Sequence, residues 1–156
     1  MQLTHTLDNV AVLSGMKWDN AQGQEIVSFI ASEAIPAGRM VELASGMVRL
    51  PQATGQASKI VGCALYQASL PPGGYAAGDV VAIMRKGKVV VDFTGTQVQF
   101  AATNVSHSST VATNRGKLTD AAANGTAGTE IADLTGLIIY KDPSVSGLTV
   151  AELNLP

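Results

Sequence analysis

The segment from Gly73 to Phe93 constrains the fold most, because it concentrates strand-forming residues. Its sequence is GGYAAGDVVAIMRKGKVVVDF, in which Val and Ile dominate on both sides of Gly87. Gly87 can adopt the positive φ that a short hairpin loop needs, and the cations Arg85, Lys86 and Lys88 would keep the loop in water. We therefore predict a β-hairpin that reverses at residues 85–88.

The turn that opens this segment recurs along the chain. Residues 35–41 (IPAGRMV) match residues 75–81 (YAAGDVV) position by position, and residues 125–131 (GTAGTEI) are a weaker copy. In each copy a Gly in fourth position precedes an apolar strand, which is typical of a turn that leads into a strand. A second pattern, Gly followed four places later by Tyr, links residues 61–66 with residues 135–140.

These patterns, together with Gly and Pro between the apolar runs, predict an all-β fold. We expect a compact small β-barrel or β-sandwich of short antiparallel strands. It has at most one short helix, and residues 118–125 are open to either one or two helical turns or a loop.

The chain of 156 residues is predicted to form one domain, residues 25–156, preceded by an N-terminal arm, residues 1–24. The arm carries Leu3, Leu7, Val10 and Trp18. Fully extended, it would reach about 60 to 70 Å, far enough to lie across a neighbouring protein. The alternative is that it supplies the first strand of the core. Trp18 would then close one end of a barrel instead of anchoring an interface.

Charged residues make up only 14% of the chain, against about 25% in a typical globular protein. The formal net charge of -2 provides little field to attract nucleic acid, so a nucleic-acid partner is not expected. A surface of Thr, Ser, Asn, Ala and Gly suits contact with other protein. We also expect no membrane partner, because the start of the chain lacks a secretory signal and a spanning apolar run.

No constellation of residues predicts an enzyme. Cys63 lies in an apolar run and is expected to be buried, while His5 and His107 are far apart with no carboxylate at a telling spacing. No nucleotide, metal or redox motif is present, so we expect no catalytic residue, no cofactor and no metal. One alternative is a biotinyl or lipoyl carrier domain with its modified lysine at Lys86 or Lys88. The neighbours of these lysines, Met-Arg-Lys-Gly-Lys, depart from the pattern of those carriers.

Several sequence segments together resemble those of the small capsid decoration, or cement, proteins of tailed bacteriophages. They are IPAGRMVEL, VGCALYQA, YAAGDVVAIMRKGKVVVDF and the late GTEIADLTGLIIYKD. The resemblance covers residues 25–153. It rests on a turn with Gly-Asp-Val before a hairpin with a charged tip, and on an Ala, Gly and Thr-rich strand that returns to the sheet.

The resemblance implies a virion structural protein that binds the outside of an assembled shell. It would brace contacts between subunits of the major capsid protein, after synthesis in the host cytoplasm. A homo-oligomer on the shell is left open, and the alternative function is a tail or fibre module. The residues that we expect to contact the partner come from the arm and from the basic tip: Leu3, Leu7, Val10, Trp18, Arg85, Lys86 and Lys88. Addition of a strand to an exposed sheet edge would suit such a surface.

Overall fold

The structure is a computed structural model that describes residues 12–19, 22–52, 59–96, 99–106, 112–121, 131–141 and 145–156. About half of these residues lie in strands, and the helix among them is a single 3₁₀ turn, which confirms the all-β prediction. The elements are β1 (Glu25–Ile30), β2 (Met40–Ala44), β3 (Met47–Arg49), β4 (Ile60–Ala64), β5 (Val80–Thr94), β6 (Ala102–Ser106), the 3₁₀ helix η2 (Ala112–Asn114), β7 (Leu118–Thr119), β8 (Ile131–Lys141) and β9 (Leu148–Asn154).

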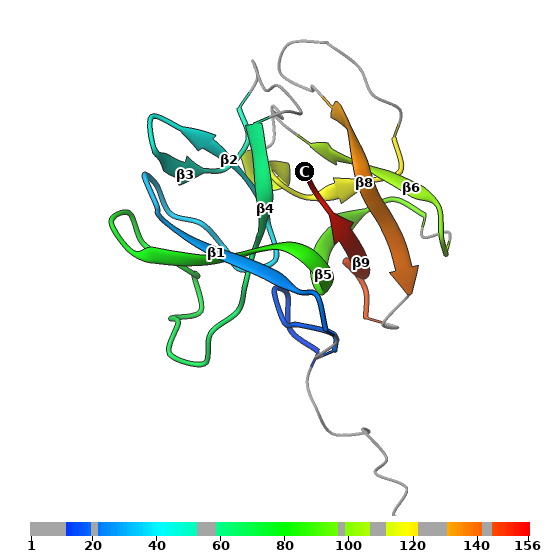
Figure 1. Cartoon of the computed structure of the whole chain (residues 1–156), viewed down its shortest axis with the longest axis horizontal. Helices are drawn as coiled ribbons and strands as arrows, with labels where there is room; N and C mark the ends of the chain where they lie inside the picture. The colour runs from blue at the N-terminus through cyan, green and yellow to red at the C-terminus, as the bar shows by residue number, and fades with distance from the viewer. Residues whose placement is uncertain are drawn as a thin grey trace, which may run out of the picture.

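Strand β5 connects the two halves of the molecule, with β1 to β4 on the left of Figure 1 and β6, β8 and β9 on the right. Its first half pairs with β1, from Ile30 opposite Val80 to Glu25 opposite Lys86, and with β4. Its second half pairs with β9, and its last two residues pair in parallel with β7. Strands β6 and β8 complete the second half through β7 and β9.

The predicted hairpin at residues 85–88 is wrong, because the chain continues through these residues as one strand of 15 residues. Gly87 does have a positive φ of 127°, but it lies opposite Leu153 of β9 within the continuous strand. Both halves of β5 find their antiparallel partners in distant segments, β1 and β9. A local reversal would have removed those longer ladders of hydrogen bonds.

Two hydrophobic cores lie on opposite faces of the layer formed by β2, β4 and the first half of β5. Neighbouring residues on β4, Cys63 and Ala64, point into different cores. The same alternation occurs on β5, where Met84 joins the larger core and Ile83 the smaller one. This layer is therefore buried on both sides, and of the two predicted architectures the fold is sandwich-like.

The predicted repeat of turn and strand is confirmed at its first two copies. Gly38 and Gly78 both have positive φ, 79° and 91°, and β2 and β5 begin two residues after them. The two copies also contact each other, since the backbones of Ile35 and Tyr75 exchange two hydrogen bonds of 2.9 Å. Most of the third copy lies outside the described residues. Of the segment left open between helix and loop, Leu118 and Thr119 form β7, and residues 122–125 are not described.

Gly62 of β4 tests how tightly the layer between the cores is packed. A Cβ atom at this position would meet the backbone oxygen of Met84 at 2.2 Å. We expect Gly62→Ala to lower the free energy of unfolding by about 1 to 3 kcal/mol, because backbone atoms of a central strand cannot move aside cheaply. Urea denaturation would measure the change.

Gly73→Ala is the matched control. A Cβ at Gly73 meets nothing within 4 Å, so its stability should stay within about 0.5 kcal/mol of the parent. Equal stability of the two variants would contradict close packing between β4 and β5.

Candidate functional site

The structure describes only some of the residues that were predicted to contact a partner. Leu3, Leu7 and Val10 lie outside the described residues, as do His5 and His107. Trp18 and the three cations of β5 are described. The structure brings Trp18 next to one of these cations, since its backbone N–H donates to the carbonyl of Lys88 at 2.9 Å.

Residues 12–19 run along the second half of β5. Gly15 N donates to Val90 O at 2.7 Å, and Val90 N donates to Met16 O at 2.8 Å. Lys17 and Val89 form an isolated antiparallel bridge. The part of the predicted arm nearest the body is therefore hydrogen-bonded to the central strand, while the division of the chain at residue 24 stays a prediction.

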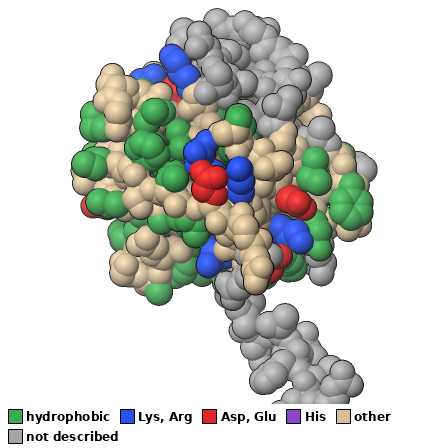
Figure 2. Space-filling view, viewed as in Figure 1, with side chains coloured by type: hydrophobic (Ala, Val, Ile, Leu, Met, Phe, Trp, Pro, Cys, Tyr) green, Lys and Arg blue, Asp and Glu red, His purple; other side chains and the backbone are tan. Residues whose placement is uncertain are grey.

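Arg85 and Lys86 form ion pairs with the same acid. Their side-chain nitrogens lie 2.9 Å and 3.5 Å from the carboxylate oxygens of Glu25 on β1. Arg85 also donates to the carbonyl of Pro156. Figure 2 shows acidic and basic groups lying side by side near the centre of this face. Because the two cations share this acidic neighbour, the positive potential of this surface is reduced.

Lys88 has an aromatic as well as an acidic partner. Its ammonium group lies 4.0 Å from the ring centroid of Tyr140 on β8 and 3.4 Å from a carboxylate oxygen of Asp19. Partial removal from water acts to lower the pKa of Lys88, but the contacts with Tyr140 and Asp19 outweigh it and raise the pKa above its ordinary value. Lys88 therefore stays charged at neutral pH.

A shallow pocket of about 300 Å³ lies where these segments meet. Both signs of charge line it, from Lys86 and Lys88 and from Asp19 and Glu152. A mixed lining of this kind favours polar contacts with protein over selective binding of an anion.

A second, apolar groove of about 510 Å³ was not predicted from the sequence. Its wall combines Leu13 with Tyr66 and three prolines, Pro36, Pro71 and Pro72. The Pro71-Pro72 pair is the one signal in the sequence, and it indicates a rigid turn without revealing that Leu13 lies beside it. The groove is formed by segments that only the fold brings together.

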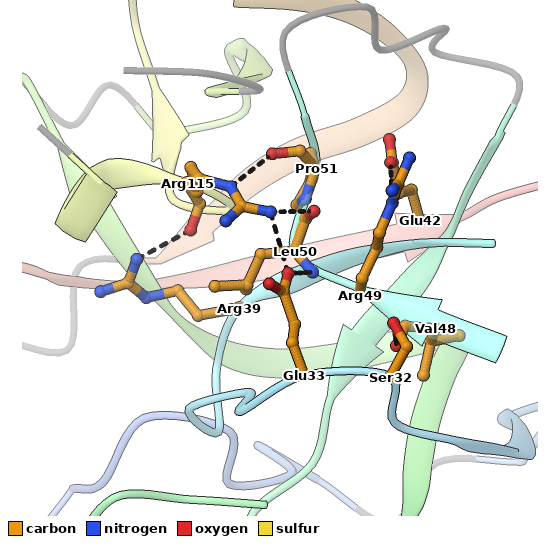
Figure 3. Close-up of polar contacts among 9 residues, drawn as sticks. All are labelled: Ser32, Glu33, Arg39, Glu42, Val48, Arg49, Leu50, Pro51 and Arg115. Atoms are coloured by element: carbon orange, nitrogen blue, oxygen red, sulfur yellow. Dashed lines mark hydrogen bonds and ion pairs between the residues drawn. The ribbon is translucent and has the colours of Figure 1, made fainter. Parts of the chain in front are cut away.

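A network of arginines holds the segment around η2 against the body (Figure 3). Arg115 donates to the carbonyls of Leu50 and Pro51 at 2.6 Å and 2.9 Å, and to Glu33 at 2.9 Å. Arg39 donates to the carbonyl of Arg115 at 2.8 Å.

Arg39 also connects this network to the central strand. Its Nε lies 2.5 Å from a carboxylate oxygen of Asp92 on β5, whose other oxygen accepts from Ser14 at 2.5 Å. The side chains of Arg39 and Asp92 are mostly buried, so the pair is poorly screened by solvent. These arginines act structurally, because each bonds to the backbone and to acids of its own chain.

Metal-ligating residue types do not cluster within the described residues. No group of three or more His, Cys, Asp or Glu residues that could hold a metal occurs in this part of the chain. Burial, with a smaller contribution from Asp92, raises the pKa of the Cys63 thiol far above its ordinary value, so the thiol stays protonated. No helix among the described residues is long and apolar enough to span a bilayer.

Replacement of Arg115 tests the structural role of the network. Arg115→Met keeps much of the side-chain volume but removes the donor to two backbone carbonyls and one of the two donors to Glu33. We expect the free energy of unfolding in urea to fall by about 1 to 3 kcal/mol. Lys117→Met, two residues along, removes a positive charge without removing these contacts, and should change stability by less than about 0.5 kcal/mol. Equal effects would show that loss of charge, and not the network, is responsible.

Comparison with known proteins identifies one family and one fold. The model of a family described as "Structural cement protein (E217 gp24/Pam3 gp6)" matches residues 1–154. A solved structure entitled "The capsid of Myoviridae Phage XM1" contains a chain with a TM-score of 0.75 and 17% sequence identity to this protein. The match covers 96% of this chain and 95% of that chain. At this identity the similarity shows a shared fold. The search of curated proteins found no match.

The family match covers nearly the whole sequence, including the segments that carry the cement-protein resemblance. The all-β body described above has the same fold as the chain of the XM1 capsid structure. The chain therefore belongs to the family of phage structural cement proteins, and its role is that of a capsid-associated structural protein of the virion.

Proposed function

We propose that the protein binds the outer surface of the phage capsid and stabilises contacts between neighbouring major capsid subunits. The family match over residues 1–154 carries this proposal. In this proposal the protein is made in the host cytoplasm, joins the shell after assembly and acts without catalysis. Its partner is the major capsid protein, and neither nucleic acid nor a membrane takes part.

The surface chemistry supports a protein partner. The three cations at the middle of β5 each form an ion pair with Glu25 or Asp19, and the chain has few charges overall. Large apolar side chains are exposed in several places, and Figure 2 shows them on both sides of the molecule. Apolar groups on a weakly charged surface favour protein contacts, which many symmetric copies would strengthen through avidity.

Strand β1 offers backbone groups for strand addition. The N–H of Ala31 donates to Asp79 at 2.9 Å, and its C=O accepts from Gly78 at 2.8 Å, so residue 31 faces β5. Because strand residues alternate in direction, Ile26 and Ser28 direct their backbone groups to the opposite edge. No strand among the described residues pairs with them there. A strand of a coat subunit could therefore extend the sheet.

The N-terminal segment is proposed to make the second contact. The residues before 12 would lie across a neighbouring coat subunit, with Leu3, Leu7 and Val10 as apolar contacts. Trp18, which is hydrogen-bonded to β5, would add an apolar contact beside them. Arg85, Lys86 and Lys88 would add polar contacts nearby. The hydrogen bonds between residues 15–18 and β5 support this arrangement, because they hold the segment that follows the proposed contact residues in a fixed position.

Reconstitution on shells tests the proposed function. Purified protein would be mixed with expanded shells of its own phage that lack it, and the mixture separated on a density gradient. We expect the protein to sediment with the shells in many copies, to coat their whole outer surface in electron micrographs, and to raise the temperature at which they dissociate. The physical reason is that each copy would bridge subunits that otherwise separate.

Two results would contradict the proposal. The first is failure of the protein to sediment with shells that expose the complete outer surface. The second is density at a single vertex, which would indicate the tail or fibre alternative.

Deletion of residues 1–11 tests the N-terminal contact separately. Residues 12–19 keep their hydrogen bonds to β5, so the truncated protein should unfold at nearly the same urea concentration as the full chain. Its affinity for shells should fall at least about tenfold, because one of two linked contacts is lost. Unchanged affinity would show that these residues do not contribute to binding. Loss of folding would show that they belong to the core.

A further inference from the structure

We propose that Phe100 is an anchor residue that inserts into an apolar pocket of a coat subunit, held in position by Tyr140 and Lys88. The inference rests on the proposed function and identifies a contact within it. Phe100 is 64% exposed, the most exposed large hydrophobic side chain among the described residues. Exposure of a single aromatic residue is common, but Phe100 also has an unusual backbone conformation and an unusual set of neighbours.

The backbone of Phe100 is held in an unfavourable conformation. Its φ is 63°, in the left-handed region that bulky side chains rarely adopt. The N–H of Phe100 donates to Ile139 O at 2.6 Å, and Ile139 N donates to Ala101 O at 2.9 Å. These two bonds to β8 keep the strained residue in place. Glycine would adopt this conformation without strain. Because the ring of Phe100 is exposed, its burial contributes little stability to offset the strain.

Tyr140, which contacts Phe100, also lies at an irregularity. In the ladder between β8 and β9, Ile139 is opposite Ala151 and Lys141 is opposite Val150, so Tyr140 is the extra residue of a β-bulge. Bulges change the direction of a side chain relative to the regular sheet. The rings of Tyr140 and Phe100 meet edge to face, with centroids 6.3 Å apart and an angle of 77°. Two separate departures from regular structure thus build one aromatic pair.

Lys88 supports this pair from β5. Its ammonium group lies over the Tyr140 ring, 4.0 Å from the centroid, and Asp19 holds the same ammonium group at 3.4 Å. Each side chain in the series from Asp19 through Lys88 and Tyr140 to Phe100 is positioned by the one before it. Phe100 therefore loses little conformational freedom on binding, which is a property of effective anchor residues.

The chemistry of the surroundings favours a protein partner. Binding of single-stranded nucleic acid needs unpaired cations beside the aromatic ring, but Lys88 is paired with Asp19, and Lys86 with Glu25. An isolated ring that projects from a weakly charged surface fits an apolar pocket on a protein. Hydrophobic side chains are visible on the side of Figure 2 where Figure 1 places β6 and the end of β8.

The variant Phe100→Gly separates binding from folding. Glycine relieves the strained φ, so we expect the midpoint of urea unfolding to stay the same or to rise. We expect binding to shells, measured by co-sedimentation, to weaken at least about 30-fold, the loss typical of an anchor residue. Met47→Ala, which removes another exposed apolar side chain at the β2–β3 hairpin, should bind shells within about twofold of the parent.

A photo-crosslinking residue at position 100 identifies the partner, with a crosslink to the major capsid protein as the expected product. The inference is overturned if Phe100→Gly binds as well as Met47→Ala, if it lowers the midpoint of unfolding, or if the crosslink joins two copies of this chain. In each of these cases the proposed function still stands when the parent protein coats the shells. Failure of the parent itself to bind removes the proposed function and the anchor together.

Discussion

Pairing of β5 along both its edges is the constraint on which the rest of the structure depends. The strand exchanges hydrogen bonds with β1 and β4 in its first half and with β9 and β7 in its second half. In the first half, alternate side chains enter two different cores, so neither face can be polar. One continuous strand thereby holds both halves of the molecule, and Gly87, with its positive φ, follows the point where the pairing passes from β1 to β9.

The scarce charges of this chain are used mainly to hold it together. Arg39 and Arg115 attach the segment around η2 to β5 and to the end of β3, through carbonyl groups and through Asp92 and Glu33. The cations of β5 likewise form ion pairs with acids of the same chain. What remains for a partner is a weakly charged surface with exposed apolar side chains, which in the proposed function would contact the capsid.

A rigid body of this kind explains how irregular residues could serve binding. Left-handed Phe100 and bulged Tyr140 both lie on strand β8 or are bonded to it, and β8 is itself paired with β6 and β9. The surrounding sheet can hold a strained residue in place because its hydrogen bonds are long-range and cooperative. In the proposed function, the same rigidity would let the protein resist separation of the coat subunits that it bridges.

The sequence by itself determined the class of the fold, the turns at Gly38 and Gly78 and the burial of Cys63, because β propensity, turn preferences and hydrophobicity are local properties. The family resemblance was also present in these local patterns. The division between arm and body, and the contacts of Leu3, Leu7 and Val10, stay predictions.

Only the tertiary structure decided that Val80 to Thr94 is one strand, since the choice between reversal and extension depended on β1 and β9. It likewise decided that Lys88 lies over Tyr140 and that Arg39 reaches Asp92. Contacts between segments distant in sequence leave no periodic signal along the chain.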